Sequence, residues 1–264
     1  MPLTAFQAAL AELLAVNRSP DSYLAGGSAM HIEPNSKRYS NDLDYFHDSE
    51  ERVATAFAAD SDLLRMAGYE VETLMQQPGF VRVLVRKGDD TTKVEWAHDS
   101  AWRFLPTIRN PQSGFLLSPI DLAVNKLLAL VGRDEPRDYL DIHDAIRDLP
   151  LGALCWAASG KDPGFTPAML LDLLRRRGRY RPEDFARLDL VHPVDLPALK
   201  SRWLAAIEDA EHFLTTRAPD EIGCLYYSPE QRRFIQPGPG DNVIPHFGRP
   251  GGVLPVVGSA RDAK

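Results

Sequence analysis

Apolar residues follow two different periods along the chain, and the change between them separates its elements. Residues 3–17 carry apolar side chains close to helical spacing, which predicts an opening helix. Residues 69–75, 80–86 and 91–97 instead have the alternating pattern of strands, and turn residues separate them. The pattern therefore predicts a helix and, later in the chain, three strands that form a meander.

The segment between the opening helix and the meander mixes short elements. We expect a strand over residues 23–25, a short helix over residues 28–33, and a strand with its approach over residues 38–46. Ser49 has the residue type of an N-cap and two glutamates follow it, so a longer helix is predicted over residues 50–67.

The second half of the chain changes to helical spacing. A helix is predicted over residues 119–131, ended by Gly132, and a second one over residues 137–149. Residues 151–216 are predicted to be mainly helical. Their last helix, over residues 195–216, is expected to bury an apolar stripe made of Trp203, Leu204, Ile207, Ala210, Phe213 and Leu214.

The composition changes again at Pro219, where proline, glycine and aromatic residues become frequent. Residues 222–236 have the pattern of a hairpin. The remainder is too apolar for a plain disordered tail, so we expect an extended arm packed on a partner surface such as a second subunit. The patterns together predict an α+β protein in three parts, with a mixed α/β core over residues 1–115, a helical domain over residues 116–218 and the arm over residues 219–264.

Composition narrows the class of protein. The chain has 264 residues, of which 44% are hydrophobic and 25% charged, as in ordinary globular proteins. No apolar run approaches about 20 residues, and the opening segment lacks the features of a signal peptide, so we expect a cytoplasmic protein without a membrane anchor. Cys155 and Cys224 are far apart in sequence and are expected to be free thiols. The net charge of −7 argues against nucleic-acid binding over the whole surface, although it permits a local basic patch.

Candidate chemistry is concentrated between residues 24 and 46. Gly26 and Gly27 permit a tight turn and the close approach of a ligand to the backbone. Asp42 and Asp44 are two positions apart on a predicted strand, so their carboxylates project from the same face. Paired carboxylates repel unless a cation lies between them, and oxygen ligands suit Mg²⁺. A phosphate-binding turn beside such a pair indicates phosphoryl or nucleotidyl transfer.

These residues resemble a known family. The Gly26-Gly27-Ser28 segment followed by Asp42-x-Asp44 is similar to the signature of the polymerase-beta-like nucleotidyltransferase superfamily. The finer pattern resembles the AbiEii/AbiGii toxin-type nucleotidyltransferases, in the order Arg38-x-Ser40-x-Asp42-Leu43-Asp44-x-Phe46. The resemblance covers roughly residues 20–215. It implies a polymerase-beta-like nucleotidyltransferase sheet with flanking helices at the N-terminal side. A solvated acidic strand after an ordinary glycine turn is the alternative.

The resemblance also implies a third acid on a later strand. Glu95 lies between apolar neighbours on the predicted strand 91–97 and occupies that place, whereas Asp99 follows the strand and is the weaker candidate. An outward-facing glutamate is the alternative interpretation of Glu95. The resemblance assigns Asp42, Asp44 and Glu95 as ligands of Mg²⁺ or Mn²⁺.

A second group of implied site residues lies on the two predicted helices after residue 118. Lys126, which we expect to project away from the core, would contact nucleotide phosphates, and Asp138 or Asp141 would complete the site. An exposed helix lysine is the alternative for Lys126, and an acid favoured by a helix N-terminus is the alternative for Asp138, whereas Asp141 lies past the first turn. The implied catalytic residues are then Asp42, Asp44, Glu95, Lys126 and Asp141. The implied nucleotide-binding residues are Gly26, Gly27, Ser28, Arg38, Ser40, Lys126, Arg137 and Asp138.

A run of five arginines follows the helix that begins near Thr166: Arg175, Arg176, Arg177, Arg179 and Arg181. This run could receive an RNA backbone, with Tyr180 stacking on a base. A solvated helix end stabilised by cations is the equal alternative.

The resemblance and the residues together predict a Mg²⁺-dependent enzyme that transfers a nucleoside monophosphate from a nucleoside triphosphate to an acceptor. The acceptor could be RNA, including tRNA, as for a toxin with a cognate antitoxin. A cationic small molecule, as in antibiotic-modifying enzymes, and a nucleotide-binding module that has lost catalysis are the alternatives. Motifs of zinc proteases, P-loop hydrolases and serine hydrolases are absent from the sequence.

Overall fold

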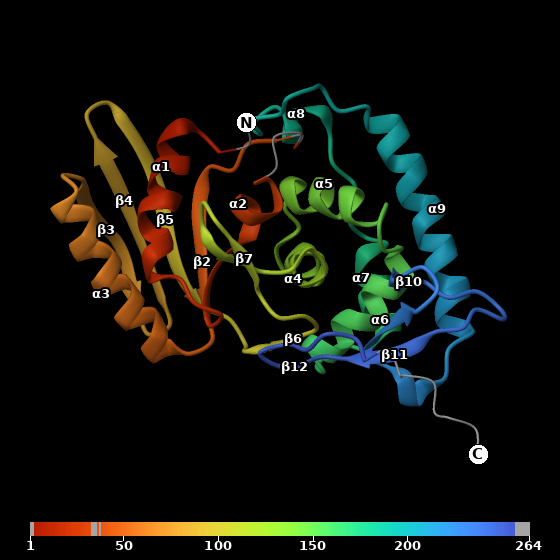
Figure 1. Ribbon diagram of the computed structural model, residues 1–264. Coiled ribbons are helices and arrows are strands. Elements are labelled where there is room, and N and C mark those ends of the chain that lie inside the picture. The colour runs from red at the N-terminus through yellow and green to blue at the C-terminus, as the bar shows by residue number, and fades with distance from the viewer. Residues whose placement is uncertain (1–2, 33–35, 37, 257–264) are drawn as a thin grey trace, which may run out of the picture.

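The computed structural model of the protein describes residues 3–32, 36 and 38–256. Figure 1 shows a sheet with two helices on one side of the molecule and a group of helices on the other, joined by short strands. The α+β fold expected from the sequence is confirmed. The division of the chain into domains at residues 115 and 218 stays a prediction.

Within the described residues, the main sheet has the strand order β3-β4-β5-β2-β1-β8-β7. Its strands are β1 Ser22–Ala25, β2 Asp42–His47, β3 Glu70–Gln77, β4 Phe80–Lys87, β5 Asp90–His98, β7 Ile108–Asn110 and β8 Gly114–Leu116. Strands β3, β4 and β5 are successive antiparallel neighbours, so the predicted meander is confirmed. Strand β2 runs antiparallel to β1 and parallel to β5, which places it at the centre of the sheet.

Alternation along β2 gives the sheet two different faces. Leu43, Tyr45 and His47 are buried, whereas Asp42, Asp44 and Phe46 are half-buried on the opposite face. The buried face packs against helices α1 Ala5–Leu14 and α3 Glu50–Met66, both of which the sequence predicted. The carboxylates of Asp42 and Asp44 thus lie on the sheet face that these two helices leave uncovered.

The turn before β2 differs in detail from the prediction. Helix α2, Gly26–Met30, begins at the glycine pair itself, two residues before the expected start, and ends at Met30. Residue 33, the expected end of this helix, lies outside the described residues. Ser49 caps α3 as predicted, because its side chain accepts a hydrogen bond from the backbone N–H of Arg52.

The helical part consists of α4 Pro119–Arg133, α5 Pro136–Ala145, α6 Leu151–Lys161, α7 Pro167–Leu174, α8 Pro182–Phe185 and α9 Leu196–Thr215. Helix α6 is buried over most of its length and packs against α4, α7 and α9. Two expectations are wrong. Gly132 does not end α4, which continues to Arg133 and is capped by Asp134 in the left-handed conformation at φ 51°. Leu204 is 69% exposed and therefore does not belong to the buried stripe of α9.

In the described residues the C-terminal arm packs on its own chain, and the expectation that it also packs on a partner surface stays a prediction. The predicted hairpin exists as β9 Cys224–Ser228 and β10 Arg233–Ile235, and β11 Ile244–Phe247 joins its other side. Strand β12, Arg249–Pro250, then pairs with β6, Trp102–Arg103. The arm therefore returns to the segment that connects strands β5 and β7 of the main sheet (Figure 1).

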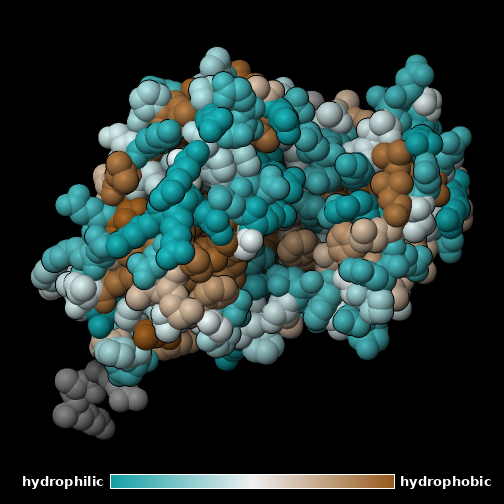
Figure 2. Space-filling view, turned by 180° about the vertical axis from the view of Figure 1, so that it is seen from behind, coloured by the Kyte–Doolittle hydropathy of each residue, from teal (hydrophilic) through white to brown (hydrophobic). Residues whose placement is uncertain are grey.

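The surface shows no single dominant apolar area on the face seen in Figure 2, where brown patches are scattered among hydrophilic residues. Among the described residues, no helix is both long and apolar enough to span a membrane. Cys155 and Cys224 are free and buried, as expected from their sequence separation.

Candidate functional site

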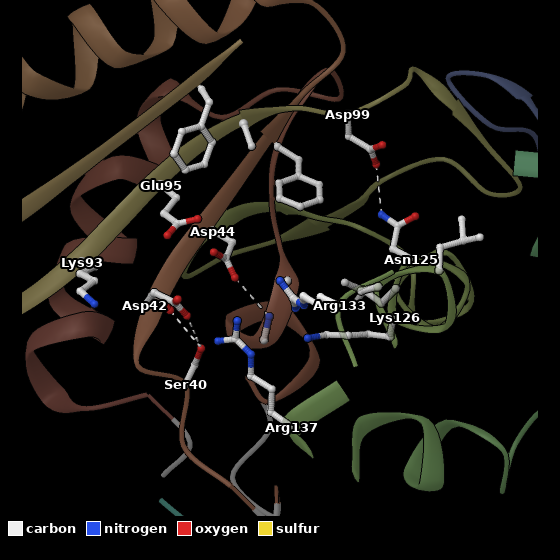
Figure 3. Close-up of a pocket in the computed structure, with 18 of the residues that line it drawn as sticks. Ser40, Asp42, Asp44, Lys93, Glu95, Asp99, Asn125, Lys126, Arg133 and Arg137 are labelled. Carbon is white, nitrogen blue, oxygen red and sulfur yellow. Dashed lines mark hydrogen bonds between the residues drawn. The ribbon is translucent and has the colours of Figure 1, made fainter. Parts of the chain in front are cut away.

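Three carboxylates meet on the open face of the main sheet (Figure 3). Asp44 is the register partner of Glu95 across the parallel pair β2–β5, and Asp42 lies two residues before Asp44. One oxygen from each of Asp42, Asp44 and Glu95 lies within 4.8 Å of the others. The structure thus brings together the three acids that the sequence nominated as metal ligands.

The glycine pair fits closely against these acids. Gly26 has φ +58°, and a Cβ there would lie 1.9 Å from Asp44 Oδ2, so only glycine is accommodated. The Gly27 backbone N–H donates to Asp44 Oδ2 at 3.3 Å. The turn therefore has two roles, because it leaves room for the carboxylate and helps to orient it.

Two serines secure the backbone of this turn and of β2. The Ser28 hydroxyl donates to the carbonyl of Ala25 at 3.1 Å and accepts from the Asp44 backbone N–H at 3.2 Å. Ser28 is fully buried and does not line the pocket, so in this structure it positions Asp44. Ser40 does line the pocket, and its hydroxyl donates to the backbone carbonyl of Asp42 at 3.0 Å.

The electrostatics of the three acids favour a bound cation. Burial, reinforced by the negative charges of Asp42 and Glu95, raises the pKa of Asp44 to about 7. A divalent cation between the carboxylates would remove this repulsion, and an all-oxygen donor set suits Mg²⁺ or Mn²⁺. The residues present therefore fit a divalent metal.

Basic side chains of α4, α5 and α6 form the opposite wall of the same pocket, and Arg82 and Lys93 line it from the sheet that carries the acids. The volume of the pocket is about 610 Å³, and its basic lining residues are Arg38, Arg82, Lys93, Lys126, Arg133, Arg137 and Lys161. Figure 3 shows Lys126, Arg133 and Arg137 extending toward the acids from the side of α4 and α5. A pocket with carboxylates on one side and cations on the other can hold a metal ion and a polyanion together.

Lys126 is buried and paired, which corrects the expectation that it projects freely from its helix. Its ammonium group lies 3.0 Å from Asp138 Oδ1 and 2.9 Å from Asp141 Oδ2. An ammonium group has three N–H donors, so two are used by α5 and one remains for the pocket that Lys126 lines.

Asp138 and Asp141 are buried acids neutralised by several protein cations. Arg38 binds Asp141 through two hydrogen bonds of 2.9 and 2.7 Å, and His31 Nε2 lies 2.8 Å from the same carboxylate. Although burial alone would raise it, these partners and Lys126 hold the pKa of Asp141 well below its usual value. Neither acid lines the pocket, so both act here by holding basic side chains in place.

Two pocket residues escaped the sequence analysis although their spacing carries a signal. Arg133 lies seven residues after Lys126, so the two residues share one face of a helix, two turns apart. Arg133 was missed because the expected helix ended at Gly132. It binds Asp138 through hydrogen bonds of 2.6 and 2.9 Å. Lys93 lies two residues before Glu95 and opposite Asp42 in the strand register, so strand period alone places it on the site face.

Asp99, the weaker candidate for the third acid, lies at the other end of the pocket. Its Oδ2 accepts hydrogen bonds from Lys161 at 2.7 Å and from Asn125 at 3.1 Å. Asp99 is absent from the acid cluster found among the described residues. Its carboxylate instead connects α4 and α6 to the end of β5.

The five arginines of the run differ in whether they form ion pairs. Arg175 forms an ion pair with Glu211, and Arg177 with Asp134 at 3.0 Å. Arg176, Arg179 and Arg181 are exposed and form no ion pair with any residue that the structure describes. Tyr180 is buried and donates to Asp134 Oδ1, so the expectation that it stacks on an RNA base is wrong.

Comparison with known proteins places the chain among nucleotidyltransferases. Residues 8–223 match the family described as the nucleotidyl transferase AbiEii toxin of type IV toxin–antitoxin systems. The solved nucleotidyltransferase toxin MenT4 from Mycobacterium tuberculosis is 20% identical, with a TM-score of 0.49 over 81% of this chain and 83% of that chain. A putative nucleotidyltransferase from H. pylori is 15% identical, with a TM-score of 0.48 over 81% and 96% of the two chains. No curated protein matches the chain.

Proposed function

Because the chain belongs to the AbiEii nucleotidyltransferase toxin family, we propose that it transfers a nucleoside monophosphate from a nucleoside triphosphate to an acceptor, with Mg²⁺ or Mn²⁺. The observation that carries this proposal is the cluster of Asp42, Asp44 and Glu95, whose oxygens lie within 4.8 Å of one another beside a pocket with a basic wall. The three carboxylates would hold the metal, which would neutralise charge on the triphosphate.

The remaining residues of the pocket would bind and orient the triphosphate. Arg137 lines the pocket, and its Nε is buried without a hydrogen-bond partner among the described residues, so it is suited to a phosphate oxygen. The third donor of Lys126 and the close-approach turn at Gly26 and Gly27 serve the same end. Catalysis would rest on alignment and charge neutralisation, without a covalent intermediate on the protein.

In this proposal Glu95 would act on the acceptor. It lies on β5 between Arg82 of β4 and Asp44 of β2, and one of its oxygens accepts a hydrogen bond from Arg82 at 2.6 Å. Its second oxygen could accept the proton of an attacking hydroxyl group. The pyrophosphate would leave on the side of the basic wall, because α4 and α5 concentrate positive charge there.

Labelling with each nucleoside triphosphate tests this function directly. The protein would be incubated with Mg²⁺, α-labelled nucleotide and total cellular RNA or protein, and Asp42→Asn would be run as the matched inactive variant. Label that enters a macromolecular fraction only with the wild type supports transfer. If the wild type binds nucleotide and metal but labels neither macromolecules nor small molecules, the protein is a binding module that has lost catalysis.

RNA, including tRNA, is the acceptor that we favour within this proposal. The exposed arginines Arg176, Arg179 and Arg181 concentrate positive charge on a chain with net charge −7. Replacing the three with alanine is expected to weaken RNA binding and to reduce its salt dependence by roughly one unit of slope per lost phosphate contact. Arg65→Ala, on the exposed surface of α3, is the matched control. An unchanged slope would remove RNA docking from this patch.

A cationic small molecule is the second candidate acceptor, and the observation that favours it is the acidic net charge of the chain. With this acceptor the triple arginine variant would keep its transfer activity, and the label would appear in low-molecular-weight products. A cognate antitoxin is expected from the toxin character of the family.

A further inference from the structure

The third acid of the site is bound by a basic residue that the proposed chemistry does not require. Arg82 lies on β4 directly opposite Glu95 on β5, and its Nε donates to Glu95 Oε1 at 2.6 Å. Arg82, Glu95 and Asp44 are consecutive partners across three neighbouring strands. The guanidinium therefore continues the row of charged side chains that crosses the open face of the sheet.

This ion pair differs from an ordinary surface pair on the same strands. Four residues further along β4, Arg86 pairs with Glu72 of β3 at 3.0 Å, and both side chains are about half exposed, at 46% and 54%. The Glu95 side chain is only 16% exposed, and Arg82 and Glu95 both line the pocket, whereas Arg86 and Glu72 do not. The positive charge of Arg82 therefore faces the pocket, whereas that of Arg86 faces solvent.

The position of Arg82 is constrained on a second side. Its guanidinium carbon lies 5.3 Å from the centre of the Phe80 ring, within the range of a cation–π contact. Phe80 also lines the pocket. The two contacts restrict the arginine to one region beside Glu95 and oppose its release into solvent.

We propose that Arg82 is a positioning residue that holds one oxygen of Glu95 and competes with the divalent cation for this carboxylate. The proposal rests on the proposed function, because it assumes that Asp42, Asp44 and Glu95 hold the cation. By occupying Oε1, Arg82 leaves Oε2 as the oxygen available to the metal or to the acceptor hydroxyl. By adding a positive charge beside three carboxylates, it weakens the binding of the cation and favours release of the metal with its pyrophosphate.

This arrangement predicts effects of opposite sign on binding and on turnover. Removing the positive charge leaves the cluster more negative, so the cation should bind more tightly. Removing the guanidinium also frees Glu95 to rotate, so the reacting groups are aligned less often and turnover should fall. Replacing a residue with a purely structural role would not produce tighter cation binding together with slower turnover.

The experiment measures Mn²⁺ binding by calorimetry without nucleotide, and then the kcat of transfer, for four proteins: wild type, Arg82→Gln, Arg82→Lys and Arg86→Gln. Arg82→Gln is expected to bind Mn²⁺ about 3- to 10-fold more tightly than the wild type. Its kcat is expected to fall about tenfold or more. Arg82→Lys keeps the charge and should restore the wild-type Mn²⁺ affinity to within about twofold. Arg86→Gln should match the wild type in both measurements.

The possible failures can be distinguished. If Arg82→Gln binds Mn²⁺ as Arg86→Gln does, or more weakly, the competition by Arg82 is refuted while the metal site remains. If the wild type itself binds no Mn²⁺, or binds it equally well after Asp44→Asn, both the metal site and the role of Arg82 are refuted. Melting temperatures of all four proteins verify that each variant is folded, since a partly exposed ion pair contributes little to the free energy of unfolding.

Discussion

Two groups of acids lie in opposite electrostatic surroundings, one lining the pocket and the other behind its basic wall. Asp42, Asp44 and Glu95 lie together on the sheet, and burial with mutual repulsion raises the pKa of Asp44 to about 7. Asp138 and Asp141 lie on α5, where ion pairs with buried basic side chains hold the pKa of Asp141 well below its usual value. The α5 acids thus have counter-charges from the protein's own basic side chains, whereas the sheet acids largely lack them.

The difference teaches how the same residue type takes two roles. The α5 acids are completed by the protein's own cations, so their charge is used to hold Lys126, Arg38 and Arg133 at the pocket wall. The sheet acids have Arg82 as their only ion-pair partner among the described residues, so their charge is available to a cation from solution. Loss of an α5 acid should therefore affect folding first, and loss of a sheet acid should affect chemistry first.

The largest expected effect comes from Asp141→Asn. Among the described residues, this change leaves the buried charge of Arg38 without its ion-pair partner and removes one of the two partners of Lys126. Breaking a buried ion pair from one side costs about 3–5 kcal/mol. Urea unfolding followed by circular dichroism would measure the loss of free energy of unfolding. Asp62→Asn, at an exposed site on α3, is the control. A loss below about 1 kcal/mol would contradict the structural role of Asp141.

Next in size are Asp42→Asn and Asp44→Asn. Each is expected to reduce transfer by about a hundredfold or more, because a charge that stabilises the transition state is removed. The free energy of unfolding without metal should stay the same or rise slightly, because like charges no longer repel one another. Glu72→Gln, in the exposed pair on β3, serves as the control for transfer and for stability. Wild-type transfer rates in both aspartate variants would refute the metal-site assignment.

The smallest expected effect is on how the free energy of unfolding depends on pH. It tests the ion pairing of Asp141 on α5 and not the sheet acids. The pKa of the Asp141 carboxyl is near 3.8 in the unfolded chain, and its ion pairs hold it well below that value in the folded protein. Its stabilising effect is therefore complete above about pH 4 and is lost as pH falls through the folded pKa. The difference in free energy of unfolding between the wild type and Asp141→Asn should be constant from about pH 5 to 8 and should shrink below about pH 4. A difference that persists unchanged to about pH 2 would argue against ion pairing of Asp141.

The C-terminal arm makes contacts within its own chain that composition does not reveal. Its apolar and glycine-rich residues favoured an arm covered by a partner, and the described part of the arm packs on its own chain. The Val253 backbone N–H donates to the carbonyl of Phe104, and a Cβ at Gly252 would lie 2.2 Å from the carbonyl carbon of Leu105. Contacts between residues about 150 positions apart leave no local pattern, so period and composition cannot reveal them.

Lys126 shows a similar limit within the site. Its sequence position favoured a helix residue that points away from the core, and the resemblance supplied a phosphate contact. The burial of Lys126 depends on Asp138 and Asp141, which reach it from a separate helix. A lysine can be buried when such partners compensate its charge, but helical spacing does not report their distance.

By itself the sequence determined the local elements and the identity of the carboxylates that gather on the sheet. Strand period placed Asp42 and Asp44 on one face, because strand alternation depends only on neighbours in the chain. The glycine pair indicated a tight turn, but the antiparallel pairing of β1 with β2 brings Gly26 beside Asp44. Tertiary structure alone decided which acids receive protein cations and which do not. The Arg38–Asp141 pair spans 103 residues and the Arg82–Glu95 pair needs the register of two strands, and the electrostatic state of a carboxylate depends on such distances in space.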